Sequence, residues 1–244
     1  MRNFSQLEPP EKALIEELIT YYASQHEKYD TFLGQMKASL TSNSLSKLVH
    51  SMKWRLKDEN SLREKLAKKL EKDIEAGVVF HITQENLFEE ITDLAGFRIL
   101  HLHTKQMDDI HPLILGILDE SQLQLKEEPT AKYWDEEYKK YFESIGIRTE
   151  SSPRLYTSVH YVIYSNLKTK LTGEIQVRTL AEELWGEADH SINYPNQSDI
   201  PSCSEQILVL ARVTSSCTRL VDSIFKTHKE GLRSSGVKQI SPKQ

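Results

Sequence analysis

Two neighbouring segments with strand-like periodicity place the strongest constraint on the fold. Apolar and polar residues alternate in GEIQVRT (residues 173–179), and the same period of two puts the polar and apolar residues of YTSVHYVIYS (residues 156–165) on opposite faces. Only the polar stretch NLKTKLT lies between them, which favours an antiparallel hairpin. The second strand would present Glu174, Gln176 and Arg178 side by side, and a strand that only supports a core does not need this set.

Helical and extended patterns alternate along the rest of the chain. Apolar residues at helical spacing predict one or two helices over residues 10–41, and the capping-box pattern SLRE at 61–64 opens another helix that ends near residue 75. Further strands are expected at 50–56, 93–102 and 122–126, further helices at 84–91, 105–118, 180–190 and 205–228, and an exposed helix or loop at 132–145. This mixture predicts an α+β fold, a mixed central β-sheet flanked by helices. We divide the chain into an N-terminal helical extension (1–45), a central domain (46–200) and a C-terminal helix with a polar tail (201–244).

Composition and charge argue against several classes of protein. The net charge of −5 is unsuited to a protein that coats nucleic acid by charge alone. The two cysteines, Cys203 and Cys217, form no CxxC pair, so neither a disulfide framework nor a zinc site is indicated. The N-terminus lacks the apolar core of a signal peptide, and no run approaches the ~18 apolar residues of a membrane span. We therefore expect a cytoplasmic protein without a membrane partner.

A dense basic run follows the N-terminal helices. On a strand, Lys53, Arg55 and Lys57 share one face, with Trp54 and Leu56 opposite. The helix that follows carries a second basic stripe at spacings of three and four, made of Lys65, Lys68, Lys69 and Lys72. Two such stripes that meet at one turn would bracket a polyphosphate, although helix lysines also commonly form a solvated face.

Two carboxylates are candidates for a magnesium site. Asp93 lies at the start of an apolar strand, where an isolated Asp is usually a turn or cap residue. Beside Glu174 it could instead bind Mg²⁺, which needs few protein oxygens because phosphates and waters complete its octahedron. On the neighbouring strand, Tyr156 could stack on a base while Ser158 and His160 reach sugar or phosphate. Taken alone, each of these three residues is better explained by a structural role.

Five motifs in this order are similar to a known family. They are KxRxK, SLxEKLxxK, DLAGFRI, YxSVH and EIQVRTxxEELWGExDH. Their order resembles the synthetase domain of RelA/SpoT-type (p)ppGpp synthetases, especially the small single-domain alarmone synthetases, over about residues 45–195. The resemblance implies a nucleotidyltransferase-like synthetase fold with helical extensions at both ends of the chain.

The resemblance also implies an activity and a set of site residues. The expected enzyme is a pyrophosphokinase that moves the β,γ-pyrophosphate of ATP to the ribose 3′-hydroxyl of GDP or GTP and makes (p)ppGpp. The expected ATP-binding residues are Lys53, Arg55, Lys57, Ser61, Lys65, Lys68 and Lys69. Asp93 and Glu174 are the expected catalytic residues and Mg²⁺ ligands. The expected acceptor-binding residues are Arg154, Tyr156, Ser158, His160, Gln176, Arg178 and His190.

One departure from the family pattern keeps the acceptor open. Family members usually carry a basic residue and then Asn-Gly before the stacking Tyr, whereas this chain has SSPRLY, with Arg154 and Leu155 before Tyr156. The alternatives are a toxic relative that modifies the 3′ end of tRNA or an adenine nucleotide, and an inactive nucleotide-binding module. The region before the synthetase motifs lacks the paired His and Asp residues of a hydrolase domain, so we expect synthesis without hydrolysis.

Apolar stripes on the terminal helices indicate assembly. Along residues 205–228 the stripe comprises Ile207, Leu210, Val213, Cys217, Leu220 and Ile224, and in the N-terminal helices it comprises Leu14, Leu18, Tyr21 and Tyr22. A terminal helix can bury such a stripe on its own domain. Small members of the resembled family, however, associate through terminal helices, so we expect a homo-oligomer.

Overall fold

A mixed β-sheet forms the centre of the molecule. The computed structural model describes residues 2–41, 43–194, 198 and 200–234. Within these residues the strand order is β1-β2-β6-β5-β3-β4. The strands are β1 (Ser51–Leu56), β2 (Ala95–His101), β3 (Thr130–Tyr133), β4 (Arg148–Ser151), β5 (Ser158–Tyr164) and β6 (Thr172–Thr179). The pairs β2/β6 and β3/β4 are parallel and the other pairs are antiparallel, so the predicted mixed α+β sheet is confirmed.

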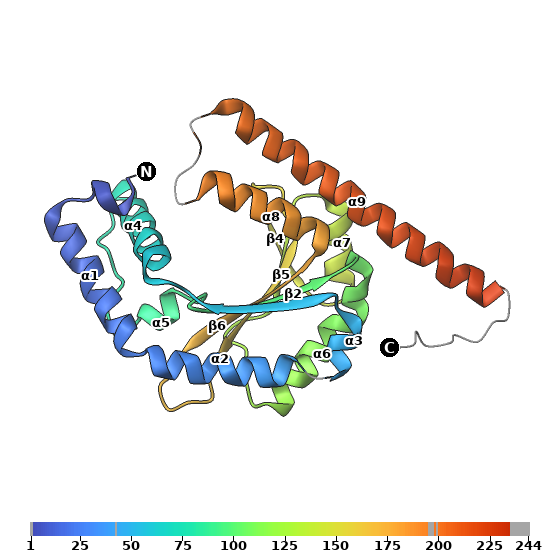
Figure 1. Ribbon diagram of the computed structural model, residues 1–244, viewed down its shortest axis with the longest axis horizontal. Helices are drawn as coiled ribbons and strands as arrows, with labels where there is room; N and C mark the ends of the chain where they lie inside the picture. The colour runs from blue at the N-terminus through green and yellow to red at the C-terminus, as the bar shows by residue number, and fades with distance from the viewer. Residues whose placement is uncertain (1, 42, 195–197, 199, 235–244) are drawn as a thin grey trace.

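Helices cover both faces of this sheet (Figure 1). Their bounds are α1 (Pro9–Ser24), α2 (His26–Leu40), α3 (Asn43–Leu48), α4 (Glu59–Glu75), α5 (Leu87–Glu90), α6 (Met107–Glu120), α7 (Glu136–Ser144), α8 (Leu180–Asn193) and α9 (Pro201–Ser234), with 3-10 turns η1 (Phe4–Gln6) and η2 (Thr104–Gln106). Helices α2 and α6 lie on one face, α8 and α9 lie on the other, and α1 and α4 pack together beside one end of the sheet. None of the helices in the described ranges is long and apolar enough to cross a membrane.

The hydrophobic core lies between the sheet and the layer of α2 and α6. The apolar members of β2 and β6, such as Phe97 and Ile175, are buried there together with Phe32 and Met36 of α2. Gly173 allows this close approach, because a Cβ at this position would lie 2.9 Å from the Phe32 ring. The start of strand β6 is therefore packed tightly against α2, immediately before Glu174.

The predicted hairpin is confirmed, and its register decides which side chains share a face. His160 of β5 lies opposite Gln176 of β6, and Arg98 of β2 lies opposite the same residue on the other side. Since directly opposed residues point to the same face of a sheet, the polar members of these strands gather away from the core. This face is covered in part by α8.

Three local predictions need correction. The N-cap of α4 is Asp58, three residues before the predicted N-cap Ser61, and its side chain accepts a hydrogen bond from the Ser61 amide at 2.9 Å. Residues 122–126 are not a regular strand and pair with β5 only through an isolated bridge at Leu125. The segment expected to be an exposed helix or loop (132–145) does contain a helix, α7, but it also includes the end of β3, and α7 buries Tyr138, Tyr141 and Phe142.

Candidate active site

The polar face of the sheet collects seven of the predicted site residues and, in addition, Arg98. It carries Lys53, Arg55, Arg98, Ser158, His160, Glu174, Gln176 and Arg178, which the strand registers place on one side. Asp93 lies in the turn before β2, and α4 brings its lysines to the same end of the sheet. Residues more than 100 positions apart in the sequence are thus assembled on one surface.

Asp93 is held between two lysines. Its carboxylate oxygens lie 2.9 Å from Lys57 Nζ and 2.7 Å from Lys65 Nζ. Burial alone would raise the pKa of Asp93, but the two ammonium groups outweigh it and lower the pKa to about 2. The backbone of Lys57 is itself fixed, because Tyr22 of α1 donates a hydrogen bond to its carbonyl at 2.8 Å. Asp93 is therefore ionised at neutral pH and rigidly placed.

Glu174 is the second ionised carboxylate of the site. Its two oxygens lie 2.7 Å from His160 Nδ1 and 3.0 Å from Gln176 Nε2, which donates to it. Burial acts to raise the pKa of Glu174, and the neighbouring His160 lowers it below its ordinary value. The charge of Asp93 raises the pKa of Glu174 and the charge of Lys65 lowers it, so the two carboxylates influence each other electrostatically. Ser158 Oγ lies within hydrogen-bond distance of His160 Nε2, so a neighbour on the same strand fixes the orientation of the imidazole ring.

These two carboxylates fit a divalent cation. In the described residues no group of three or more His, Cys, Asp or Glu side chains is arranged around a common metal position. A cation at this site would therefore depend on two carboxylates and on oxygens from a ligand, which is the coordination that Mg²⁺ adopts with phosphates. Both carboxylates are ionised at neutral pH, as metal binding requires.

The other expected ATP-binding residues line β1 and α4. Lys53 and Arg55 are exposed on β1, and Lys69 lies 3.6 Å from Glu90. Lys68 lies 4.9 Å from the centre of the Tyr194 ring, and burial lowers the pKa of this lysine. Ser61 is inside α4, where its carbonyl accepts a hydrogen bond from the Tyr194 hydroxyl at 3.1 Å.

The end of α8 lies against α4. His190 stacks on Tyr194 with ring centroids 4.5 Å apart, so it joins the cluster of Tyr194, Lys68 and Ser61. The sequence motifs place His190 among the expected acceptor-binding residues, whereas Tyr194 is not among the expected site residues. The spacing of four residues between His190 on α8 and Tyr194 at its C-cap is the signal that could have shown this pair.

Glu183 at the start of α8 is a site residue that the sequence motifs did not single out. One of its oxygens lies 3.0 Å from Lys53 Nζ and 2.9 Å from Arg98, and Arg178 contacts the other. Its side chain is only 8% exposed. A single buried carboxylate thus binds cations from β1, β2 and β6, and Gly186 leaves the space that the Arg178 guanidinium occupies. The available sequence signal is the double acid Glu182-Glu183 in the first turn of the helix that follows the strand carrying Arg178.

The expected acceptor residues lie beside α8. Tyr156 stacks on Trp185 with a centroid distance of 5.7 Å and an interplanar angle of 10°, and its other neighbour is the His160 ring at 6.4 Å. Arg154 is largely exposed and pairs with Asp189 at 3.4 Å. The structure therefore brings Tyr156 and His160 together, and His160 links them to Glu174.

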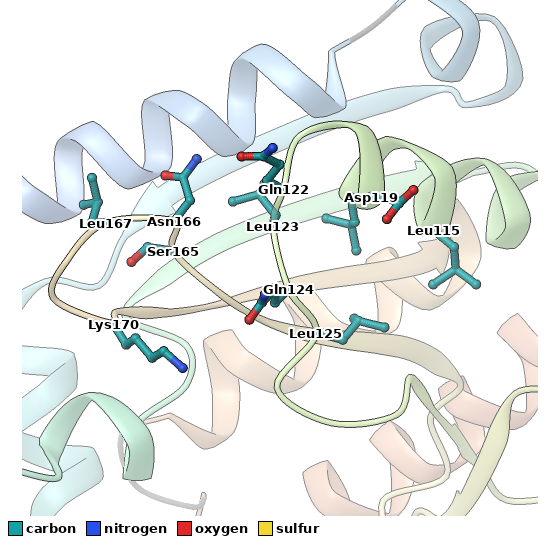
Figure 2. Close-up of a pocket in the computed structure, with 11 residues that line it drawn as sticks. Leu115, Asp119, Gln122, Leu123, Gln124, Leu125, Ser165, Asn166, Leu167 and Lys170 are labelled. Carbon is teal, nitrogen blue, oxygen red and sulfur yellow. The ribbon is translucent and has the colours of Figure 1, made fainter.

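A separate pocket lies away from this site. Figure 2 shows it between the end of α6, residues 122–125 and the β5–β6 connection, with a volume of about 990 Å³. Its rim includes Asp119 and Lys170, and Lys170 lies over the Tyr164 ring at 5.1 Å. None of the predicted site residues lines this pocket.

Comparison with known proteins decides the family. Residues 54–199 match the model of a region found in RelA/SpoT proteins. The chain belongs to the RelA/SpoT family. No curated protein matches the sequence. The matched region contains both carboxylates, all the predicted acceptor residues and all the predicted ATP-binding residues except Lys53.

Solved structures show how far this likeness extends across the fold. A GTP pyrophosphokinase family protein from Streptococcus pneumoniae is 21% identical, with a TM-score of 0.54 over 88% of this chain and 94% of the other. A protein from Streptococcus mutans UA159 is 20% identical, with a TM-score of 0.52 over 88% and 97% of the two chains. The small alarmone synthetase 1 from Bacillus subtilis bound to its product pppGpp is 19% identical, with a TM-score of 0.49 over 88% and 96%. The first two similarities confirm the predicted synthetase fold.

Proposed function

We propose that this RelA/SpoT family protein is an ATP-dependent pyrophosphokinase that transfers the β,γ-pyrophosphate of ATP to the ribose 3′-hydroxyl of GDP or GTP, forming (p)ppGpp. The observation that carries the proposal is the pair of ionised carboxylates, Asp93 between Lys57 and Lys65 and Glu174 against His160. The family and the similarity to a GTP pyrophosphokinase family protein from Streptococcus pneumoniae support the same activity.

The proposed ATP-binding half of the site is based on charge complementarity. ATP brings a polyphosphate, and the basic residues of β1 and α4 are placed to neutralise it. Lys57 and Lys65 each donate a hydrogen bond to Asp93, and phosphate oxygens would compete for their ammonium groups. If the two lysines bound phosphate oxygens in place of Asp93, the Asp93 carboxylate would be free to bind Mg²⁺ together with Glu174. Mg²⁺ at this position would supply charge neutralisation across the phosphate oxygens.

The reaction itself needs positioning more than covalent help. The acceptor 3′-oxygen attacks the β-phosphorus of ATP, the new P–O bond forms, and the bond to the α–β bridging oxygen breaks with its electron pair leaving on AMP. Glu174 is ionised and can accept the hydrogen bond and then the proton of the attacking hydroxyl. Gln176 and His160 keep its carboxylate aimed at that position.

In the proposed acceptor site, the Tyr156 ring binds the base of the nucleotide. Its ring has Trp185 on one side, so a purine would stack on the opposite face or at its edge toward His160. Arg178 is bound by Glu183 and lies at the same end of β6, where it would meet charge on the acceptor. We propose guanine nucleotides as the acceptors because the family resemblance runs through both Tyr156 and the EIQVRT strand.

Label transfer tests the function directly. The protein is incubated with Mg²⁺ and ATP labelled at the γ-phosphate, and with GDP, GTP, ATP or deacylated tRNA in separate reactions. Label on GDP or GTP, with AMP released in equal amount, is the expected result. Label on an adenine nucleotide or on the tRNA 3′ end would replace the proposed acceptor by one of the two alternatives. Nucleotide binding without AMP release in any reaction would indicate an inactive binding module.

A further inference from the structure

Leu155 has a backbone conformation that side chains with a Cβ rarely adopt. Its φ is +60°, in the left-handed region. Its amide donates a hydrogen bond to the Ser152 carbonyl at 3.1 Å, which closes a tight turn directly before Tyr156. Gly or Asn meets this requirement at little cost, whereas leucine is strained there. A strained residue next to the expected base platform needs a compensating interaction.

An apolar cluster supplies that compensation. Leu155 and Tyr156 pack against buried residues of α8 and α9, namely Trp185, Ile207 and Ala211. The Trp185 indole also donates from Nε1 to the Ile207 carbonyl at 3.1 Å. This small core is separate from the main core of the sheet. It links the acceptor loop, the helix behind it and the C-terminal helix.

The loop is anchored at three further points. The Ser152 amide donates to the Tyr133 carbonyl at 2.6 Å, and the Thr157 amide donates to Glu182 Oε2 at 3.1 Å. Between these two anchors, Arg154 pairs with Asp189. Residues 152–157 are thus fixed at both ends by hydrogen bonds and in the middle by the Leu155 side chain.

We infer that Leu155 is a positioning residue that fixes the Tyr156 ring against Trp185, and that the first turns of α9 form the back wall of the acceptor site. The expected effect on the acceptor KM rests on the proposed function. The expected ordering of the loop rests on the geometry alone. A platform that is ordered before the acceptor arrives does not lose conformational entropy on binding. The acceptor therefore binds more tightly than it would to a mobile loop.

Substitutions at Leu155 separate anchoring from backbone strain. Leu155→Gly removes both the strain and the apolar anchor, and Leu155→Asn accepts the left-handed backbone but supplies no apolar contact. Both should raise the acceptor KM by about tenfold and leave the ATP KM within about twofold. Leu155→Met keeps an apolar side chain and should stay near wild type. Ile207→Ala on α9 should change the acceptor KM in the same direction as Leu155→Gly. Val79→Gly is the matched control, because Val79 is an apolar loop residue that is 85% exposed.

Hydrogen exchange of the nucleotide-free protein tests the ordering of the loop without any reaction. The Thr157 amide should exchange about tenfold faster in the Gly and Asn variants than in wild type and the Val79→Gly control. Unchanged exchange together with an unchanged acceptor KM would overturn the inference, and so would equal increases in the KM of ATP and acceptor. If wild type transfers no label, the proposed function fails, and the exchange rates alone still decide whether Leu155 orders the loop.

Discussion

Lys65 Nζ lies 2.7 Å from Asp93 Oδ1, and this ion pair joins α4 to the turn before β2. Lys57, which directly follows β1, binds the other oxygen of the same carboxylate, with its Nζ 2.9 Å from Asp93 Oδ2. The pairing keeps Asp93 ionised and keeps both lysines where a polyphosphate is proposed to bind. On binding of nucleotide and Mg²⁺ these three groups would exchange partners, the lysines taking phosphate oxygens and Asp93 taking the cation, and all three are already held at one point.

Asp93→Asn and Glu174→Gln should each lower the rate of pyrophosphate transfer by at least about 10²-fold, because each removes a charge placed at the reacting phosphate. Initial rates of AMP formation at saturating ATP and GDP measure the effect. Lys72→Ala is the control, since Lys72 is exposed near the far end of α4 and should keep wild-type rates. Near-wild-type turnover of either carboxylate variant would exclude the proposed magnesium site.

The Asp93 ion pairs should also make stability depend on pH. The folded-state pKa of Asp93 is about 2 and its ordinary value is 3.8, so the pairs stabilise the fold above about pH 4 and this contribution is lost as pH falls toward 2. The free energy of unfolding of wild type relative to Asp93→Asn should therefore fall by about 2 kcal/mol between pH 5 and pH 2. Urea titrations of both proteins across this range measure the difference. A constant difference would mean that the two lysines do not stabilise the ionised carboxylate.

Glu182 should give the opposite pH dependence. Burial raises the pKa of Glu182 to about 7, although its carboxyl accepts a hydrogen bond from the Thr157 amide. Because the folded pKa lies above the ordinary value of 4.5, wild type loses stability as pH rises from about 4.5 through 7. Glu182→Gln keeps the acceptor oxygen without the charge, so it should match wild type at pH 4 and be more stable by about 3 kcal/mol at pH 8.

Thermal unfolding at a series of pH values measures the Glu182 effect. Glu205→Gln, an exposed substitution on α9, is the control and should follow wild type at every pH. If Glu182→Gln were also parallel to wild type from pH 4 to pH 8, the carboxyl would titrate normally and its burial would have no energetic consequence.

The strands with long alternating patterns could be predicted from sequence, whereas short or strained parts could not. The period of two extends along the seven residues of β5 and the eight residues of β6. This pattern is long enough to predict both strands before their pairing is known. Strands β3 and β4 have four residues each, too few for a period to stand out, and they form by pairing, β3 with the edge of β5 and β4 with β3. The left-handed Leu155 is set by packing against Trp185, which no local pattern encodes.

The site residues divide in the same way. Motif residues such as Asp93 and Glu174 could be named from sequence because their types and order are distinctive. Glu183 could not, since its role depends on β1, β2 and β6 bringing three cations to one point. A residue whose partners come from separate elements becomes apparent only when those elements are assembled.

Glu183→Gln should destabilise the protein by about 3 kcal/mol, because it leaves Arg178 and its neighbours without a buried counter-charge. Glu187→Gln is the matched control on the same helix. Glu187 also contacts Arg98, at 2.8 Å, but its side chain is 58% exposed, so the loss should be at most about 1 kcal/mol. Chemical denaturation of the three proteins at neutral pH makes the comparison. Equal losses would show that the cations do not depend on the buried carboxylate.

Assembly through α9 is the last prediction. The stripe expected from sequence divides in the structure: Ile207 is buried against α8, whereas Val213, Leu220 and Ile224 are 56–63% exposed. The N-terminal stripe is largely used internally, with Leu18 and Tyr22 buried in the main core. An exposed apolar row on one long helix is typical of a subunit interface. We therefore predict a homo-oligomer formed through α9 alone.

Light scattering during size-exclusion chromatography measures this directly. Wild type should have a mass that is a multiple of 28.2 kDa, and Val213→Glu combined with Leu220→Glu should reduce it to that of one chain. Both substitutions lie on the exposed side of α9, away from the Trp185 cluster, so the acceptor loop should keep its hydrogen-exchange rates. Leu14→Glu is the control for an exposed apolar residue of α1, and it should leave the mass unchanged. A wild-type mass near 28.2 kDa at every concentration would mean that the α9 row is exposed in the free protein and that neighbouring sites are not coupled through it.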